Sequence, residues 1–170
     1  MTALYLLKKA KLQQGQGILI YGASGSVGSY AMQLAKHHFG ATVTGVCSTG
    51  NLEWVRALGA DHIIDYTQTD FTQQPERYDV IFDAVGKLKG AQAKSVLKPG
   101  GKYLSVKTPT QEKLEDLQQL STLIEAEKIR PVIDKTYPLE AIVEAHHYVD
   151  TGRKKGNVVI TVNEQVKSTA

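Results

Sequence analysis

A glycine-rich turn between an apolar strand and a helix is the feature that most constrains how this chain folds. Residues 18–21 (ILIY) form a short apolar run between glycines, which is typical of a buried strand. Residues 22–28 (GASGSVG) follow directly, and apolar residues at helical spacing continue from Val27 to Ala35. The start of such a helix carries unpaired N–H groups and the positive end of the helix dipole, which together favour a bound phosphate.

The turn matches the fingerprint G-x-G-x-x-G of dinucleotide-binding proteins except at its first position, where Ala23 stands and Gly22 precedes it. In that fingerprint Gly25 lets the backbone approach the phosphates, and Gly28 lets the helix pack closely on the strand. The flanking strand and helix make the match more specific than the glycines alone. The sequence therefore predicts a pyrophosphate site, and the alternative is a glycine-rich loop without a ligand.

Strand and helix signals alternate over about the first hundred residues. Strands are expected at 18–21, 41–47, 62–65, 78–84 and 102–106, and helices at 4–12, 27–38, 52–58 and 88–97, with a turn at 98–101. This alternation predicts an α/β fold, a Rossmann-type doubly wound parallel sheet with helices on both faces, over residues 1–106.

Beyond residue 106 the pattern changes to a helix–strand–helix–strand segment, 107–170. A leucine stripe predicts a helix over 114–124, and a short strand is expected at 130–135. Pro138 is expected to open a second helix that Gly152 closes, before a last strand at 158–162. The polar tail from residue 163 is expected to be frayed.

Composition excludes several functions. The chain has 170 residues, near the size of one domain, and 20 Lys and Arg against 17 Asp and Glu leave a net charge of +3, too small to indicate a nucleic-acid partner. No apolar run is long enough to span a membrane, and the first apolar run precedes its lysines, so a soluble, cytoplasmic protein is expected. One cysteine, Cys47, and histidines in adjacent pairs predict no metal site, and residues 153–155 (RKK) are interpreted as a solvated loop.

The end of the second expected strand indicates which nicotinamide cofactor is preferred. NAD-binding sheets usually place an acid there, but here none occurs before Glu53. Ser48, Thr49 and Asn51 can instead donate hydrogen bonds to a 2′-phosphate, which favours NADP(H). The alternative is a polar loop with no preference between the cofactors.

Phrases along most of the chain resemble the medium-chain dehydrogenase/reductases, in their zinc-independent, quinone-oxidoreductase-like branch. The matching phrases occur in family order at 22–28, 33–36 (QLAK), 58–61 (LGAD), 64–66 (IDY), 79–86 (DVIFDAVG), 97–101 (LKPGG), 130–134 (RPVID) and 156–162 (GNVVITV). The resemblance implies NADPH-dependent reduction of an activated C=C bond or a quinone.

The resemblance also implies cofactor contacts beyond the glycine turn. It implies that Ser48, the Asn51 region and Tyr66 bind the 2′-phosphate, and that Val85, Gly86 and Ser105 lie beside the ribose and nicotinamide. No catalytic residue is predicted. The complete predicted cofactor site is Gly22, Ala23, Ser24, Gly25, Ser26, Val27, Gly28, Ser48, Thr49, Asn51, Tyr66, Val85, Gly86 and Ser105.

Two departures from the family pattern affect the expected function. Family members carry an N-terminal catalytic domain before the segment that matches Thr2, and a sixth strand, which often mediates dimerisation, after the one that ends near Val106. We therefore expect this chain to bind cofactor but to turn over poorly, and its oligomeric state stays open. The alternatives are a non-catalytic dinucleotide-binding module or truncated gene product and, remotely, an S-adenosylmethionine methyltransferase.

Overall fold

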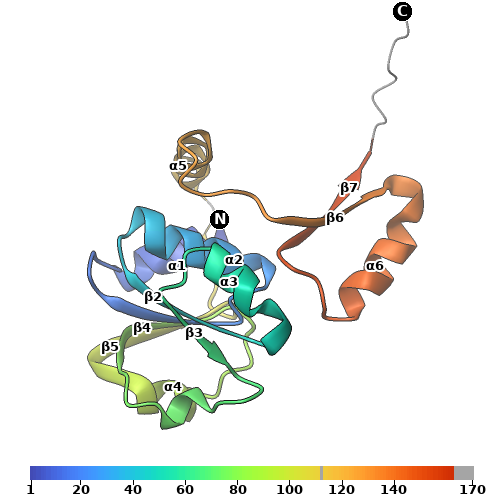
Figure 1. Cartoon of the computed structure of the whole chain (residues 1–170). Coiled ribbons are helices and arrows are strands. Elements are labelled where there is room, and N and C mark those ends of the chain that lie inside the picture. The colour runs from blue at the N-terminus through green and yellow to red at the C-terminus, as the bar shows by residue number, and fades with distance from the viewer. Residues whose placement is uncertain (112, 163–170) are drawn as a thin grey trace, which may run out of the picture.

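The computed structural model describes residues 1–111 and 113–162, so the expectation of a frayed tail lies outside the described residues. Its main sheet has five parallel strands in the order β3-β2-β1-β4-β5 (Figure 1). The strands are β1 (Gly17–Tyr21), β2 (Thr42–Cys47), β3 (His62–Asp65), β4 (Tyr78–Asp83) and β5 (Leu97–Ser105). Strand order reverses at β1, which pairs with both β2 and β4. The predicted doubly wound parallel sheet is confirmed.

Helices cover both faces of this sheet (Figure 1). One face carries α1 (Thr2–Ala10), α2 (Ser26–Gln33) with its π-helical continuation Leu34–His38, and α3 (Leu52–Ala57). The other carries α4 (Gly90–Val96) and the 3-10 turn Phe71–Gln73. Because both faces are buried, the central strands are apolar nearly throughout, as in ILIY of β1.

Two boundaries differ from the predicted ones for local reasons. Helix α1 ends at Ala10, two residues before the predicted end at Leu12, because Lys11 adopts a left-handed conformation and its N–H donates to the Lys8 carbonyl oxygen at 2.9 Å. The turn predicted at 98–101 lies within β5, where Tyr78 pairs with Leu97 but Val80 already pairs with Lys102. Residues 98–101 therefore bulge out of an irregular strand.

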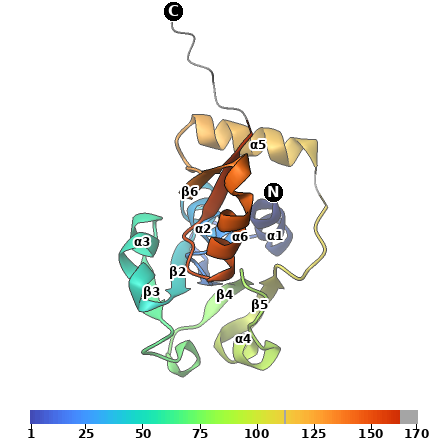
Figure 2. The ribbon, with the colours of Figure 1, turned by 90° about the vertical axis from the view of Figure 1, so that its right-hand side faces the viewer.

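The segment after β5 folds back onto the first face of the sheet. It contains α5 (Leu114–Glu125), β6 (Ile133–Pro138), the 3-10 turn Leu139–Ala141, α6 (Ile142–Asp150) and β7 (Asn157–Thr161). Strands β6 and β7 pair in parallel as a separate sheet with α6 beside them (Figure 2). Pro138 is the last residue of β6 and the N-cap of the 3-10 turn Leu139–Ala141, which leads directly into α6 at Ile142.

Buried side chains attach this segment to the Rossmann body. Leu123, Ile129 and Val132 belong to the core cluster that includes α1 and α2. The buried amide of Gln33 in α2 donates to the Arg130 carbonyl oxygen at 3.1 Å and accepts from the Arg130 N–H at 2.7 Å. No helix within residues 1–111 and 113–162 is long and apolar enough to cross a membrane.

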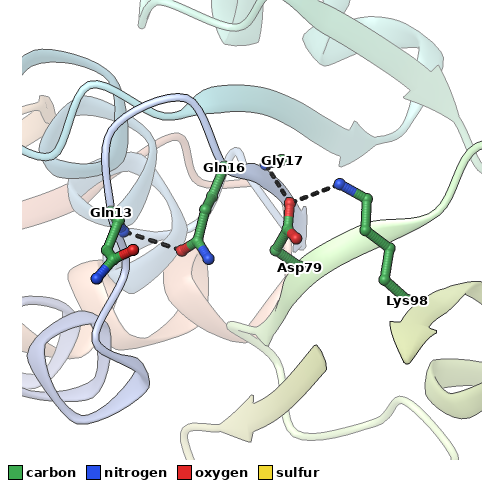
Figure 3. A network of polar contacts seen from close by, with 5 residues as sticks. All are labelled: Gln13, Gln16, Gly17, Asp79 and Lys98. Atoms are coloured by element: carbon green, nitrogen blue, oxygen red, sulfur yellow. Dashed lines mark hydrogen bonds and ion pairs between the residues drawn. The ribbon is translucent and has the colours of Figure 1, made fainter. Parts of the chain in front are cut away.

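A polar network closes the sheet at the amino ends of β1 and β4 (Figure 3). Asp79 accepts hydrogen bonds from the Gly17 N–H and from Lys98 Nζ, both at 2.8 Å, and the Gln13 N–H donates to Gln16 Oε1 at 2.9 Å. Partial burial of Asp79 opposes its ionisation, but the bonds from Lys98 and Gly17 outweigh that effect and hold the pKa of the carboxyl group below its usual range.

We expect Asp79→Asn to lower the free energy of unfolding at pH 7 by about 1 kcal/mol, since it removes charge-assisted hydrogen bonds. A carboxyl group with a lowered pKa contributes stability above its unfolded-state pKa, about 3.9, and loses it as pH falls through the folded-state pKa. Urea unfolding of the unsubstituted chain and of Asp79→Asn should therefore show a difference in the free energy of unfolding at pH 7 that becomes smaller below about pH 4. A difference in the free energy of unfolding that does not change with pH would show that the charge on Asp79 does not contribute to stability.

A candidate cofactor site at the carboxyl ends of the strands

A cavity of about 640 Å³ lies at the carboxyl ends of β1, β2 and β4. This is the point where strand order reverses, and ligands of doubly wound sheets bind there. Nine of the predicted cofactor residues line the cavity: Gly22, Ser24, Gly25, Ser26, Val27, Ser48, Asn51, Tyr66 and Val85. The fold thus brings together residues that the sequence places in four separate stretches.

The glycine turn is anchored to the end of β2. The N–H groups of Gly22 and Ala23 both donate to the Val46 carbonyl oxygen at 3.0 Å, and Gly22 has the positive φ of +81° that favours glycine. Ala23 is fully buried, so this predicted cofactor residue faces the core rather than the cavity. The anchoring fixes where α2 begins relative to the sheet.

Gly25 and Gly28 lack side chains for different reasons. A Cβ on Gly28 would lie 2.1 Å from the Gly22 carbonyl oxygen, so only glycine permits the close packing of α2 on the turn. A Cβ on Gly25 would meet nothing closer than that same oxygen at 3.6 Å, an ordinary contact. Packing within the chain does not require glycine at position 25, and the space beside it belongs to the cavity.

The start of α2 supplies hydrogen-bond donors to this space. The first intrahelical hydrogen bond of α2 runs from the Ser29 N–H to the Gly25 carbonyl oxygen, at 2.8 Å. The N–H groups of Ser26 and Val27 come before it in the chain, so they have no partner within the helix. Those N–H groups and the helix dipole favour an anion at this place. The residues present therefore fit the pyrophosphate of a dinucleotide.

The end of β2 differs from its prediction in one respect. Ser48 and Asn51 line the cavity, with Asn51 Nδ2 donating to Ser48 Oγ at 3.1 Å, but Thr49 does not line it. Thr49 instead donates to Asp65 Oδ2 at 2.5 Å. Hydrogen bonds from Thr49 and then from Thr67 lower the pKa of Asp65, so this carboxylate stays ionised beside the loop.

The sequence prediction considers only the residues that follow β2 along the chain, and it therefore omits Asp65, which ends the neighbouring strand β3. Asp65 lies directly opposite Cys47 in the β2–β3 register. The signal was its position at the end of a predicted parallel strand, since such ends meet at one edge of the sheet.

The loop after β4 is organised by a buried carboxylate. Asp83 is fully buried and accepts from the N–H groups of Val85 at 3.0 Å, Gly86 at 2.8 Å and Leu88 at 3.0 Å. Its Oδ2 also accepts from the hydroxyl group of Tyr103 at 3.2 Å. Asp83 thereby holds Val85 against the glycine turn; a polar residue inside an apolar strand was the signal that it needed partners.

Two further predicted residues, Gly86 and Ser105, do not line the cavity. Gly86 has a φ of +77° and faces the Lys107 side chain. Ser105 is buried, and its Oγ accepts from the Lys107 N–H at 3.3 Å.

Several lining residues were not predicted as cofactor contacts: Tyr21, Cys47, Ala84, Lys87, Val149, Gly152 and Lys154. Burial, and secondly Asp65, raise the pKa of the Cys47 thiol to about 11, so it stays protonated and is not a nucleophile at neutral pH. Burial, and then Tyr66 and Asp83, likewise raise the pKa of Tyr21. The interpretation of Lys154 as part of a solvated loop is wrong, because its side chain is partly buried and bonds to the glycine turn.

The described residues do not fit a metal ion. Within 1–111 and 113–162 no three His, Cys, Asp or Glu side chains come together as metal ligands.

The fold and the glycine turn at the switch point define a Rossmann protein of the dinucleotide-binding class. Residues 26–130 match the family model of zinc-binding dehydrogenases, and residues 106–160 match a second model with the same description. The chain belongs to this family, within the medium-chain dehydrogenase/reductase superfamily and its quinone-oxidoreductase-like members. This membership leaves no support for the methyltransferase alternative.

Most of this chain aligns with proteins of known name. It is 41% identical to a 2-methylene-furan-3-one reductase of Solanum lycopersicum, over 94% of this chain and 44% of the relative. It is 37% identical to a chloroplastic NADPH-dependent alkenal/one oxidoreductase of Arabidopsis thaliana, over 91% of this chain and 42% of the relative. The solved quinone oxidoreductase of Coxiella burnetii has 30% identity and a TM-score of 0.87, over 95% of this chain and 57% of that one. The chain thus spans about half the length of the proteins it matches.

Proposed function

We propose that these 170 residues bind NADP(H) as the cofactor half of an oxidoreductase that reduces activated C=C bonds or quinones. The observation that carries the proposal is the open space beside Gly25, at the start of α2 and at the switch point of the sheet. The names of the relatives support the substrate class, since they describe reductases of furanones, of alkenals and enones, and of quinones.

Each part of the cavity has a distinct task in this function. The Ser26 and Val27 N–H groups hold the pyrophosphate, while Ser48 and Asn51 donate to the 2′-phosphate. Val85, fixed through Asp83, lies against the glycine turn and borders the ribose and nicotinamide. When bound, NADPH supplies the hydride, and these residues bind and orient it.

The cofactor preference gives the direct test. We expect NADPH to bind more tightly than NADH, because Ser48 and Asn51 can hydrogen-bond a 2′-phosphate and the acid that binds a ribose 2′-hydroxyl is replaced by Ser48. Losing one charge-assisted hydrogen bond costs about 1.5–3 kcal/mol, or about 10- to 100-fold in affinity. Calorimetric titration of the chain with each cofactor measures the ratio, and equal or reversed affinities would contradict the proposal.

Substitution of Ser48 refines this test. Ser48→Asp should weaken NADPH binding by about tenfold or more through charge repulsion and leave NADH binding unchanged or tighter. Ser48→Ala is the matched control, since it removes the hydroxyl group without adding charge and should reduce NADPH binding less. The ionised carboxylate of Asp65, beside Thr49, is expected to repel a 2′-phosphate and so to weaken the preference for NADPH. Asp65→Asn should therefore increase the ratio of the affinity for NADPH to the affinity for NADH.

A further inference from the structure

We propose that Lys154, contributed by the loop between α6 and β7, is a cationic ligand of the dinucleotide pyrophosphate at the glycine turn. The inference rests on the proposed cofactor site and extends it to a residue that the fingerprint does not contain. It assigns to the C-terminal segment a direct part in binding.

The chain brings this loop to the turn through backbone contacts. Gly25 and Gly156 form an isolated parallel bridge, and the Gly156 N–H donates to the Ser24 carbonyl oxygen at 3.1 Å. Ser26 Oγ donates to the Gly156 carbonyl oxygen at 2.7 Å. The loop is thus fixed beside the first residue of α2, where the pyrophosphate is expected.

Within this arrangement the ammonium group of Lys154 is placed at the phosphate site. Its Nζ donates to Ser26 Oγ at 2.6 Å and to the Gly156 carbonyl oxygen at 2.7 Å, and its side chain lines the cavity with Gly25 and Val27. An ammonium group has three donors, so one remains for a ligand.

The charge of Lys154 is not compensated by a contact. Among the ion pairs of the described residues none involves Lys154. Burial lowers the pKa of Lys154, and Asp134 only partly offsets this effect. The carboxylate of Asp134 is itself occupied, accepting from the Tyr148 hydroxyl group at 2.6 Å and from the Lys155 N–H at 3.0 Å. A partly buried cation held by two neutral oxygens is stabilised by an anion in the adjoining cavity.

The geometry selects the pyrophosphate rather than the 2′-phosphate as the group bound. Lys154 contacts Ser26 at the start of α2, whereas the predicted 2′-phosphate residues Ser48 and Asn51 follow β2. Because NADPH, NADH and ADP-ribose all carry the pyrophosphate, Lys154 should support the binding of each by a similar factor.

The test compares three variants of the whole 170-residue chain by calorimetry with NADPH, NADH and ADP-ribose. Lys154→Gln should weaken all three ligands by about 10- to 100-fold, the loss expected for one charge-assisted hydrogen bond, and Lys154→Arg should retain most of the affinity. Lys155→Gln is the matched control, because it removes the same charge from an exposed neighbour and should change affinity less than about threefold. The salt dependence of binding should also become shallower in Lys154→Gln alone.

Each outcome decides the matter. If the unsubstituted chain binds dinucleotides and Lys154→Gln binds as Lys155→Gln does, the inference about Lys154 is wrong while the proposed function stands. If Lys154→Gln weakens NADPH binding and leaves NADH binding unchanged, Lys154 contacts the 2′-phosphate and not the pyrophosphate, which would contradict the inference. If the unsubstituted chain binds neither dinucleotide nor ADP-ribose, the proposed function and the inference both fail. Circular dichroism melting of Lys154→Gln separates lost binding from lost folding: a variant that melts early and regains binding at low temperature indicates a structural role only.

Discussion

Replacing Gly25 by valine is expected to abolish dinucleotide binding and leave the fold intact. The backbone at Gly25 has φ −78° and ψ 176°, which any residue adopts, and an added Cβ meets no protein atom closer than 3.6 Å. The valine methyl groups would instead occupy the space in which the pyrophosphate approaches the backbone. We expect a Kd for NADPH raised by more than about 100-fold, the equivalent of two lost hydrogen bonds, with little change in the melting temperature.

Gly28→Val is the matched control with the opposite expectation. A Cβ at position 28 would lie 2.1 Å from the Gly22 carbonyl oxygen and 2.9 Å from Ala23 Cα. Both are backbone atoms, which cannot move aside without displacing α2 from the glycine turn. This variant should not fold, with a loss of several kcal/mol in stability. Circular dichroism measures whether each variant folds, and calorimetry measures whether it binds NADPH. A Gly25→Val protein that is folded and binds NADPH normally would show that the glycine turn is not the phosphate site.

The second large effect concerns turnover: the 170-residue chain should bind NADPH yet reduce enones and quinones far more slowly than about 10 per second, the median for enzymes. Hydride transfer needs the acceptor carbon about 3–3.5 Å from the nicotinamide, a group that stabilises the developing oxyanion, and exclusion of water. In the described lining of the cavity, the loop after β4 contributes Ala84, Val85 and Lys87, and β5 contributes no residue.

A fusion tests where the remaining groups come from. About half of each matched relative has no counterpart in these 170 residues. Joining to this chain the part of the tomato reductase that has no counterpart here should raise turnover of an enone by orders of magnitude without changing the Kd for NADPH. Steady-state kinetics of both proteins measure this, and rapid turnover by the 170-residue chain alone would contradict the expectation.

The local signals of the chain were sufficient for the sheet and for the glycine turn. The short runs ILIY and YDVIFD, rich in branched and aromatic residues, are typical of buried strands, and glycines at 22, 25 and 28 are typical of a tight turn into a helix. Boundaries were less predictable: α1 stops at Lys11 because of a left-handed backbone conformation that no residue type there announces.

Contacts between distant segments account for what the sequence did not disclose. Asp65 reaches the loop after β2 only through strand pairing, and it draws Thr49 away from the cavity. In the sequence Lys154 is one of three consecutive basic residues, which predicts an exposed loop. In the structure the bridge between Gly25 and Gly156 brings Lys154 to the glycine turn. Such pairings depend on the fold as a whole, so residue type and spacing alone did not predict them.

The bridge at Gly156 has a consequence for the order in which the protein acquires its ligand affinity during synthesis. Ser26 and Gly156 are 130 positions apart, yet their contact completes the phosphate turn. A ribosome-bound chain releases the five strands of the main sheet before residues 154–156 emerge, and domains begin to fold during synthesis. If Lys154 binds the pyrophosphate as proposed, a nascent chain stopped before Lys154 has the glycine turn without this cation, and we expect it to bind the cofactor less tightly than the released chain.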